Sequence, residues 1–248
     1  MKQTIPDLSG KTALVTGASR GLGRAMALAL AKAGAHVLAL ARTVGGLEEL
    51  DDEIQAAGAG SASLIPLDLA DPAAIERLGP ALAARFPKLD IFVANAGVLG
   101  ELAPLPDIDD DIWRRTIDLN LTANWRLIKT LDPLLRASGA ARAVFITSKV
   151  GGAEARPFWG AYACSKAALE ILAETYALES KLFGIKVAII DPGAMRTRMR
   201  EKAMPGEDPK TLPDPSELAP LLYAAVSPDY AGLAERFIFR EWRAKALS

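Results

Sequence analysis

Short runs of apolar residues alternate along this chain with segments long enough to form helices. The apolar runs, which we predict to be strands, are 12–16, 36–40, 63–67, 91–94, 143–147, 186–190 and 236–239. Nearly continuous apolar character is expected of parallel strands that are buried on both faces of a sheet. The predicted helices between them are 22–33, 46–57, 72–86, 110–136 and 161–183. This alternation predicts an α/β fold with right-handed crossovers, in which a doubly wound, mostly parallel seven-stranded sheet carries helices on both faces.

No linker, repeat or low-complexity tract divides the chain, so residues 1–248 are predicted to form a single domain. The segment 196–215 stands apart because it holds Pro205, Pro209 and Pro213 among many charged residues. We interpret it as a mobile substrate loop, with room for a short helix. The residues after the last predicted strand are expected to form a short polar tail.

A glycine-rich turn joins the first predicted strand to the first predicted helix. Gly17, Gly21 and Gly23 follow the apolar run 12–16. Glycine lets the backbone approach a ligand closely, and a helix N-terminus offers free N–H groups to a pyrophosphate. The spacing differs from the Gly-x-Gly-x-x-Gly of many dinucleotide enzymes, and a tight turn that binds nothing is the alternative. In this strand–turn–helix context we interpret it as the phosphate-binding turn of a Rossmann-type NAD(P)-binding domain.

The same turn also matches a Gly-x-Ser-x-Gly nucleophile elbow, through Gly17, Ser19 and Gly21. A hydrolase of that kind needs an acid and then a histidine later in the chain. The single histidine, His36, lies at the start of the next predicted strand, and none follows it. We therefore set the hydrolase aside and predict a structural role for His36.

Tyr162 and Lys166 stand four residues apart at the start of a predicted helix. This spacing places both side chains on one helix face. An ammonium beside a phenol favours the phenolate, so we expect the pKa of Tyr162 to lie below its reference of about 10. A tyrosine of that kind can serve as acid or base for a carbonyl or an alcohol near neutral pH.

The composition argues against several other classes of protein. A formal net charge of -1 gives no electrostatic reason to bind nucleic acid or an anionic membrane. One cysteine, Cys164, rules out an intramolecular disulfide, which favours a reducing cytoplasmic location. No uncharged apolar run approaches the roughly 20 residues of a membrane helix, and residues 1–10 lack the apolar core of a signal peptide. With one histidine, a histidine-rich zinc site is not expected.

Further motifs follow one another in a fixed order. They are Thr16-Gly17-x-x-x-Gly21-x-Gly23, Asp68-Leu69, Asn95-Ala96-Gly97, Asn120, Ser148, Tyr162-x-x-x-Lys166 and Pro192-Gly193. The ordered set, from about Gly10 to Thr197, resembles the short-chain dehydrogenase/reductase family. The resemblance implies a nicotinamide-dependent oxidoreductase that forms a homodimer or homotetramer through the helices 110–136 and 161–183.

The resemblance also implies catalytic roles. Tyr162 would be the general acid/base, and Lys166 would lower its pKa and hold the nicotinamide ribose. Ser148 would hydrogen-bond the substrate oxygen, and Asn120 would hold a water that links Lys166 to solvent. Taken singly, Asn120 could instead be a buried polar residue bonded to backbone, and Lys166 a solvated one.

Cofactor contacts are implied at the turns that follow the strands. The implied residues are Gly17, Ser19, Arg20, Gly21, Leu22, Gly23, Arg42, Asp68, Leu69, Asn95, Ala96, Gly97, Tyr162, Lys166, Pro192, Gly193 and Thr197. Asp68 would accept from the adenine amino group, although it could simply cap the helix near residue 72. Pro192, Gly193 and Thr197 would close over the nicotinamide.

Two departures from the family pattern concern Ser148 and the C-terminus. Ser148 lies 14 residues before Tyr162, where the family usually has 13, and Lys149 occupies that position. We favour Ser148, with one extra residue in the loop 152–159, over Thr147. The glycine-rich segment that often follows the family's last strand is missing here, which leaves a tetramer interface of that kind in doubt.

The end of the second predicted strand bears on the choice of cofactor. NAD enzymes usually place an acidic residue there to bind the ribose 2′-hydroxyl, whereas this chain has Ala41 followed by Arg42. Arg42 and Arg20 could clasp a 2′-phosphate, so we predict NADP(H) over NAD(H). In the alternative, Arg20 faces solvent and Arg42 pairs with Glu48 or Glu49.

The predicted reaction is reversible hydride transfer between NADP(H) and a small-molecule carbonyl or secondary alcohol, without a metal. The alternatives are a non-catalytic dinucleotide-binding scaffold or sensor and, with less support, a nucleotide-binding methyltransferase. No charge cluster in the sequence identifies the substrate. Phe158 and Trp159 suggest an apolar wall of its pocket, or else anchors of a subunit interface.

Overall fold

The computed structural model describes residues 5–247. Residues 1–4 and 248 lie outside the described residues. The predictions that they belong to the same domain, and that residues 1–10 are not a signal peptide, therefore stay predictions for these positions. Seven strands form one parallel sheet in the order β3-β2-β1-β4-β5-β6-β7. The strands are β1 (Thr12–Thr16), β2 (His36–Ala41), β3 (Ser61–Pro66), β4 (Ile91–Ala94), β5 (Arg142–Ile146), β6 (Lys186–Asp191) and β7 (Glu235–Ile238). The predicted fold class is confirmed.

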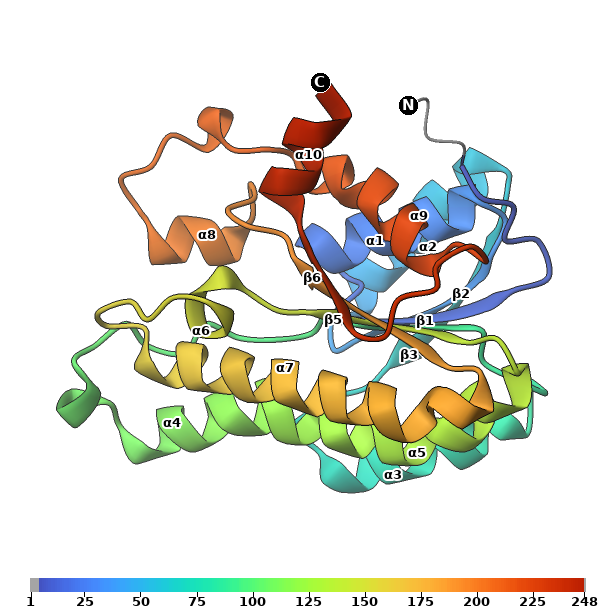
Figure 1. Cartoon of the computed structure of the whole chain (residues 1–248), viewed down its shortest axis with the longest axis horizontal. Coiled ribbons are helices and arrows are strands. Elements are labelled where there is room, and N and C mark those ends of the chain that lie inside the picture. Colours follow the sequence, from blue (N-terminus) through green and yellow to red (C-terminus); the bar gives the residue numbers. More distant parts are fainter. Residues whose placement is uncertain (1–4, 248) are drawn as a thin grey trace.

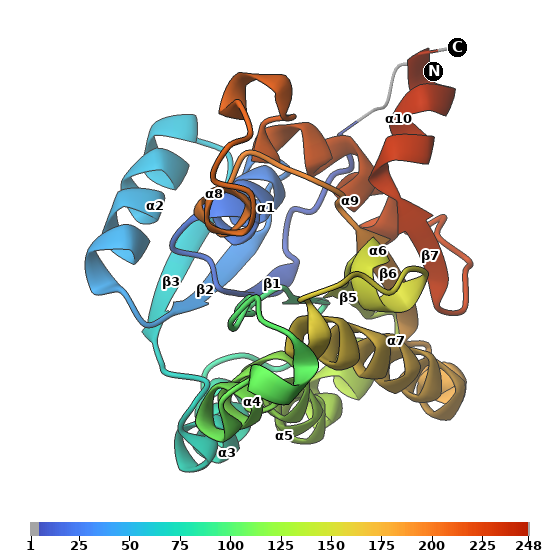
Figure 2. The same ribbon diagram turned by 90° about the vertical axis from the view of Figure 1, so that its left-hand side faces the viewer.

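Helices cover both faces of the sheet, as Figures 1 and 2 show. One layer holds α1 (Gly21–Lys32), α2 (Val44–Ala57) and α9 (Ala219–Val226). The other layer holds α3 (Pro72–Ala83), α4 (Asp110–Ile117), α5 (Ala123–Ser138) and α7 (Gly160–Ser180). The short helices α6 (Lys149–Gly152) and α8 (Arg198–Ala203) lie at the same end of the sheet as the start of α7.

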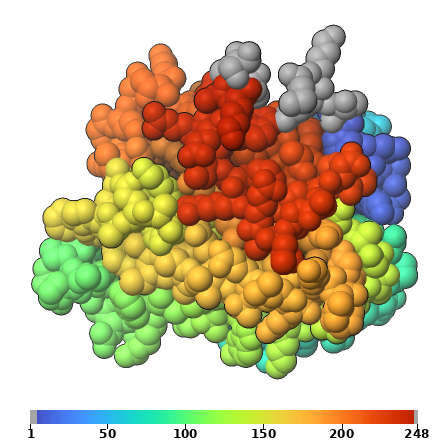
Figure 3. Space-filling view, viewed as in Figure 1, coloured from blue at the N-terminus to red at the C-terminus, as the bar shows by residue number. Residues whose placement is uncertain are grey.

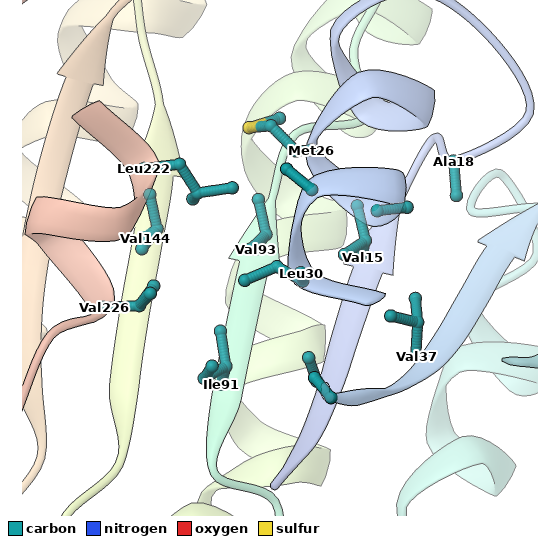
Figure 4. Packing of buried hydrophobic residues seen from close by; sticks show 14 of the residues in the cluster. Val15, Ala18, Met26, Leu30, Val37, Ile91, Val93, Val144, Leu222 and Val226 are labelled. Atoms are coloured by element: carbon teal, nitrogen blue, oxygen red, sulfur yellow. The ribbon is translucent and has the colours of Figure 1, made fainter. Parts of the chain in front are cut away.

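The strands are apolar throughout because each face of the sheet packs against helices. Val15 on β1 belongs to the core beneath α1 and α9, where it joins Leu30 and Leu222 (Figure 4). Its neighbour Leu14 belongs to the opposite core, with Leu127 of α5. Successive side chains of a strand point to opposite faces, so a strand buried on both sides cannot alternate with polar residues.

The strand order reverses between β1 and β4, which pair with each other at the centre of the sheet. In an open α/β sheet, ligands bind outside the carboxyl ends of the strands at such a switch point. The turns after β1 and β4 carry Gly17 and Asn95. The topology therefore brings two of the predicted cofactor motifs together.

The predicted helix 110–136 forms without a gap, but it is not a regular α-helix throughout. A π-helical turn, Asp118–Thr122, separates α4 from α5. Within that turn the side chain of Asn120 bonds to the segment after β4, and the Asn124 amide donates to the Asn120 carbonyl oxygen at 2.8 Å. Pro133, by contrast, lies inside α5 without ending it.

The segment 196–215 is more regular than a loop. It contains α8 and a 3-10 turn, Pro209–Thr211, and a second 3-10 turn, Pro215–Leu218, begins at its end. An Arg200–Glu207 ion pair at 2.5 Å and an Arg196–Asp214 pair at 3.4 Å tie it to itself. Its predicted mobility stays a prediction.

The C-terminal part of the chain is also more ordered than expected. After β7 the predicted polar tail is instead a helix, α10 (Phe239–Leu247). Phe239 is buried, which anchors the start of this helix in the core beneath α9. The red surface of Figure 3 shows this last part of the chain running across one face of the molecule. Among residues 5–247, none of the helices combines the length and the apolar character that crossing a membrane requires.

Candidate active site

A cleft of about 2600 Å³ runs along the carboxyl ends of the strands. Small-molecule pockets are usually about 300–1,000 Å³, so this cleft has room for a dinucleotide and a second ligand. All the predicted cofactor-binding residues line it, together with Ser148. Asn120 is the one predicted site residue outside the lining.

The glycine turn lies against the segment after β4. A Cβ at Gly23 would collide with the Gly17 carbonyl oxygen and would lie 2.6 Å from Nδ2 of Asn95. Gly17 has a positive φ of 69°, and a Cβ there would lie 2.9 Å from the same nitrogen of Asn95. These glycines allow the turns after β1 and β4 to pack against each other. Packing therefore requires glycine at these positions, in addition to any requirement of ligand binding.

Thr16 joins the two turns through its side chain. Its hydroxyl accepts from the backbone N–H groups of Asn95 and Ala96, at 2.9 and 3.0 Å, and donates to the Val93 carbonyl oxygen at 3.3 Å. The Asn95 amide in turn donates to the Thr16 carbonyl oxygen at 2.8 Å. This network fixes the first residues of both motifs relative to each other.

The N-terminus of α1 has the features of an anion site. No side chain caps it, and its first turn holds no acidic residue. Its first N–H groups and its positive dipole end therefore remain available to a phosphate. Arg20, which lines the cleft, occupies the N-cap position of α1. Thr197, which also lines the cleft, lies beside Gly21: a Cβ added to Gly21 would be 3.6 Å from the Thr197 methyl group.

At the end of β2, Arg42 does not form the ion pair with Glu48 or Glu49 that was considered as the alternative to cofactor binding. It pairs instead with Asp68 at 3.7 Å. Glu49 instead pairs with Arg24 at 2.9 Å. Both members of the Arg42–Asp68 pair are about half exposed, so the pair is weak. The helix after β3 is capped by Asp71, not by Asp68, which removes the capping alternative for Asp68.

Ser148, Tyr162 and Lys166 meet where α6 and α7 begin. Ser148 ends the segment after β5 and caps α6 by accepting from the Val150 N–H at 3.2 Å. Burial raises the pKa of Tyr162 to about 12, against the lowering effect of its hydrogen bond with Ser148. The expected low pKa of Tyr162 is therefore wrong for this structure, because desolvation of the phenolate outweighs the favourable contacts.

Three neighbouring residues, Thr147, Ser148 and Lys149, were candidates for the catalytic position before Tyr162, and their contacts distinguish them. Lys149, at the usual family spacing, points into solvent and pairs with Glu154 at 2.6 Å. Thr147 is buried, and its hydroxyl interacts with the Glu170 carboxylate, not with Tyr162. Ser148 is thus the residue that faces the tyrosine.

Lys166 is almost completely buried beneath Tyr162. Its Nζ donates to the Ile146 carbonyl oxygen at 2.8 Å and lies 5.8 Å from the centre of the Tyr162 ring. Burial lowers the pKa of Lys166 to about 8, and the nearby Glu170 carboxylate acts to raise it. Cys164, on the opposite face of the helix, is exposed, as the spacing predicts.

Asn120 is buried and fully bonded. Its Oδ1 accepts from the Val98 N–H at 2.8 Å, and its Nδ2 donates to the Val98 carbonyl and to the Ser165 hydroxyl, both at 2.9 Å. These bonds match the alternative of a buried residue bonded to backbone. They fix the π-helical turn against the segment after β4 and the start of α7, while the water relay stays a prediction.

Sequence reasoning missed a buried charged group behind Lys166. Glu170, one turn further along α7, lies 3.4 Å from Arg236 of β7, which also reaches Asp191 at 3.9 Å. A Cβ at Gly152 would lie 2.5 Å from Oε2 of Glu170 and still closer to its Oε1. The signals were a glutamate four residues after Lys166 and an arginine at the start of the predicted strand 236–239, and only the fold brings them together.

The substrate end of the cleft is apolar around the tyrosine. Tyr162 clusters with Leu99, Val150 and Ala203, and the last of these belongs to α8. Trp159 packs edge-on against the Tyr162 ring at 5.8 Å and lines the cleft. Phe158 is exposed and does not line it, so only Trp159 fits the predicted wall. His36 has the structural role predicted for it, because it bonds to Ser61 and Ser63 of β3.

Comparison with known proteins agrees with this geometry. The chain is 36% identical over 216 residues to the oxidoreductase YciK of Escherichia coli strain K12, covering 86% of this chain and 85% of that protein. It is 36% identical over 206 residues to an NAD-dependent oxidoreductase of Mycobacterium tuberculosis strain H37Rv, covering 78% of this chain and 74% of that one.

A solved structure is similarly close. The short chain dehydrogenase of Escherichia coli CFT073, complexed with NADPH, superposes with a TM-score of 0.89 at 33% identity and covers 96% of this chain and 99% of that one. The sequence model of the family described as short chain dehydrogenase matches residues 11–208. The chain therefore belongs to the short-chain dehydrogenase family of nicotinamide-dependent oxidoreductases.

Proposed function

We propose that this enzyme transfers hydride reversibly between NADP(H) and a small-molecule carbonyl or secondary alcohol, with Tyr162 as the general acid/base. The supporting observation is that Ser148, Tyr162 and Lys166 meet in a cleft that also reaches the glycine turn. A non-catalytic scaffold would not need a buried lysine beneath a buried tyrosine.

The cleft fits a nicotinamide dinucleotide. The uncapped N-terminus of α1 would receive the pyrophosphate, and Gly17 and Gly23 leave no side chain in its path. Lys166 would hold the nicotinamide ribose, and Asn95 would line the cofactor path between the two turns. The bound nicotinamide supplies or accepts the hydride.

Tyr162 would supply the proton that accompanies hydride transfer. With a pKa of about 12 the phenol stays protonated at neutral pH, so it can donate to the oxygen of a carbonyl as negative charge develops there. Ser148 would give that oxygen a second hydrogen bond. The Lys166 ammonium, held by the Ile146 carbonyl, would stabilise the phenolate that remains.

The preference for NADP(H) over NAD(H) rests on the end of β2. Ala41 provides no carboxylate for a ribose 2′-hydroxyl, and within the described part of the chain Arg42 is held only by the weak contact with Asp68. Arg20 lines the same part of the cleft without an ion-pair partner among residues 5–247. A 2′-phosphate would be a stronger partner than Asp68 for the Arg42 guanidinium.

The decisive experiment compares Tyr162→Phe with the unaltered enzyme. Both are titrated with NADPH and NADH by fluorescence, and both are then assayed with a panel of neutral ketones, aldehydes and alcohols. We expect NADPH binding to be retained and turnover to be abolished in the variant. Turnover that survives the substitution would contradict the role of Tyr162. Binding of neither nucleotide by the unaltered protein would favour a scaffold.

We also propose a homodimer built on α5 and α7. These neighbouring helices present exposed apolar side chains in Trp125, Ile171 and Leu178. Leu182, just after α7, is 92% exposed. Exposed large apolar side chains that gather on neighbouring helices are typical of an interface. Light scattering of the purified protein would test it, with a tetramer as the alternative. A cytoplasmic location and the absence of nucleic-acid and membrane partners stay predictions.

A further inference from the structure

Around the apolar cluster at Tyr162, the lining of the cleft is markedly basic. Beyond the adenosine end, which residues 17–69 line, ten basic and four acidic side chains face the cleft. The whole chain has a formal net charge of -1, so this excess is local. A cleft lined by one sign of charge concentrates ligands of the opposite sign. The sequence did not reveal this, because the basic residues come from separate elements.

Several of these charges are already neutralised. Lys149 pairs with Glu154, and Arg200 pairs with Glu207. Arg156 differs from them, because no ion pair or side-chain hydrogen bond involves it among residues 5–247. The Glu154 carboxylate forms its ion pair with Lys149 at 2.6 Å and attracts the exposed Arg156 only more weakly, so the Arg156 guanidinium can bind an added anion.

Arg156 is nevertheless held in a defined place. Its guanidinium lies over the Trp159 ring, 5.4 Å from the ring centre. Trp159 in turn packs edge-on against Tyr162, with ring centres 5.8 Å apart. The guanidinium therefore cannot be farther from the Tyr162 ring than the sum of these two distances. A cation stacked on an aromatic face loses less side-chain freedom when it binds a ligand.

The backbone next to Trp159 is strained. Phe158 has a φ of 72°, a left-handed conformation that bulky side chains rarely adopt. It is held there by a hydrogen bond from the Ala103 N–H to its carbonyl oxygen, at 3.1 Å. Strain of this kind persists only where the surroundings enforce it, and it clusters at ligand sites.

We propose that Arg156 binds a carboxylate or phosphate on the substrate, so that the enzyme acts on oxo or hydroxy compounds with an anionic group a short chain away from the reacting carbon. The proposal rests on the proposed oxidoreductase function and adds the substrate class to it. Trp159 positions the guanidinium, and Tyr162 acts on the carbonyl at the other end of the molecule.

The test compares matched anionic and neutral substrates. Oxo acids of increasing chain length are assayed beside their methyl esters, and dihydroxyacetone phosphate beside dihydroxyacetone. The acid–ester arm reports carboxylate recognition and the phosphate arm reports phosphate recognition. The measured quantity is the ratio of kcat/KM within each pair, at constant salt and saturating NADPH.

Three variants accompany the unaltered enzyme. Arg156→Gln removes the charge, and Arg156→Lys keeps the charge without the planar stack. Arg85→Gln is the matched control, because Arg85 lies 5.4 Å over the Phe86 ring and does not line the cleft. We expect the anionic member of a pair to be preferred by on the order of ten- to a hundredfold, the range for hydrogen bonds to charged groups. Arg156→Gln should remove the preference, Arg156→Lys should keep part of it, and Arg85→Gln should leave it unchanged.

The possible failures are distinct. If neutral partners are used equally well, or if Arg156→Gln leaves the ratio unchanged, the anionic substrate class is refuted while the oxidoreductase function stands. If neither kind of compound is turned over by protein that binds NADPH, the proposed function is refuted and the substrate class with it. Continued turnover of neutral compounds by Arg156→Gln shows that the variant is folded.

Discussion

Replacing Gly152 with alanine would test whether the buried carboxylate of Glu170 supports α6, the short helix that Ser148 caps. Gly152 ends α6, whose cap is Ser148, and its φ is not in the left-handed region. Alanine is therefore compatible with the backbone, and the whole cost comes from the contact. The new Cβ would lie 2.5 Å from Oε2 of Glu170, where ordinary contact begins at 3.4 Å.

The size of the effect follows from this overlap. Either the carboxylate or the turn has to move by about 1 Å, and overpacking of this kind costs about 1–3 kcal/mol of stability. Glu170 is held by Arg236 and is 8% exposed, so it has little room to yield. A shift of about 1 Å in the turn would also displace Ser148, and we expect kcat to fall by on the order of a hundredfold.

The assay combines urea denaturation with NADPH-dependent turnover for Gly152→Ala, Glu170→Ala and the double variant. If the contact is the cause, the double variant should be no less stable than Glu170→Ala alone, because the shortened side chain removes the clash. Gly45→Ala is the control, since nothing lies within 4 Å of a Cβ there and a helical alanine should be neutral or stabilising. Simple additivity of the two losses would refute the reasoning.

Three other predictions concern the cofactor, the pH dependence of turnover and stability. Arg42→Ala should raise the KM for NADPH by about tenfold or more and change that for NADH little, because the 2′-phosphate loses a charge-assisted partner; equal effects in steady-state kinetics would count against this. The pKa of Lys166 is about 8 in the fold, so its ammonium is lost as pH rises through that value, and carbonyl reduction should slow there; a flat pH–rate profile would contradict this. Asp90 is buried and its pKa lies below the usual value, so its stabilising effect is present above about pH 4 and lost as pH falls through its folded pKa. Asp90→Asn should thus cost about 1–3 kcal/mol at pH 7 and much less in acid, by urea denaturation at both values; an unchanged gap in acid would exclude the carboxylate as the cause.

The elements that local pattern controls could be predicted from the sequence. The bounds of β1 and β4 match the prediction, since each is an apolar run followed at once by a polar or glycine-rich turn. The common face of Tyr162 and Lys166 follows from their spacing on α7, and both are buried while Cys164 is exposed.

Features that depend on distant contacts could not be predicted. The π-helical turn at Asn120 is held by bonds to residues 22 and 45 positions away, Val98 and Ser165. The raised pKa of Tyr162 comes from burial beneath Val150 and other apolar neighbours. The four-residue spacing showed that the charge of Lys166 lies near Tyr162. It could not show that packing excludes water from the tyrosine, which is what raises its pKa.

The ion pair between Glu170 and Arg236 has a consequence for how the enzyme is made. A ribosome builds a chain from its N-terminus, and the early part begins to fold before the late part exists. When α7 and β6 have already emerged, Glu170 and Asp191 are present as two acidic groups without Arg236 between them. The charge balance behind Lys166 is completed only when β7 joins the edge of the sheet beside β6. A nascent chain that contains every motif residue therefore still lacks the cation that balances the acidic groups behind Lys166 until its last strand is made.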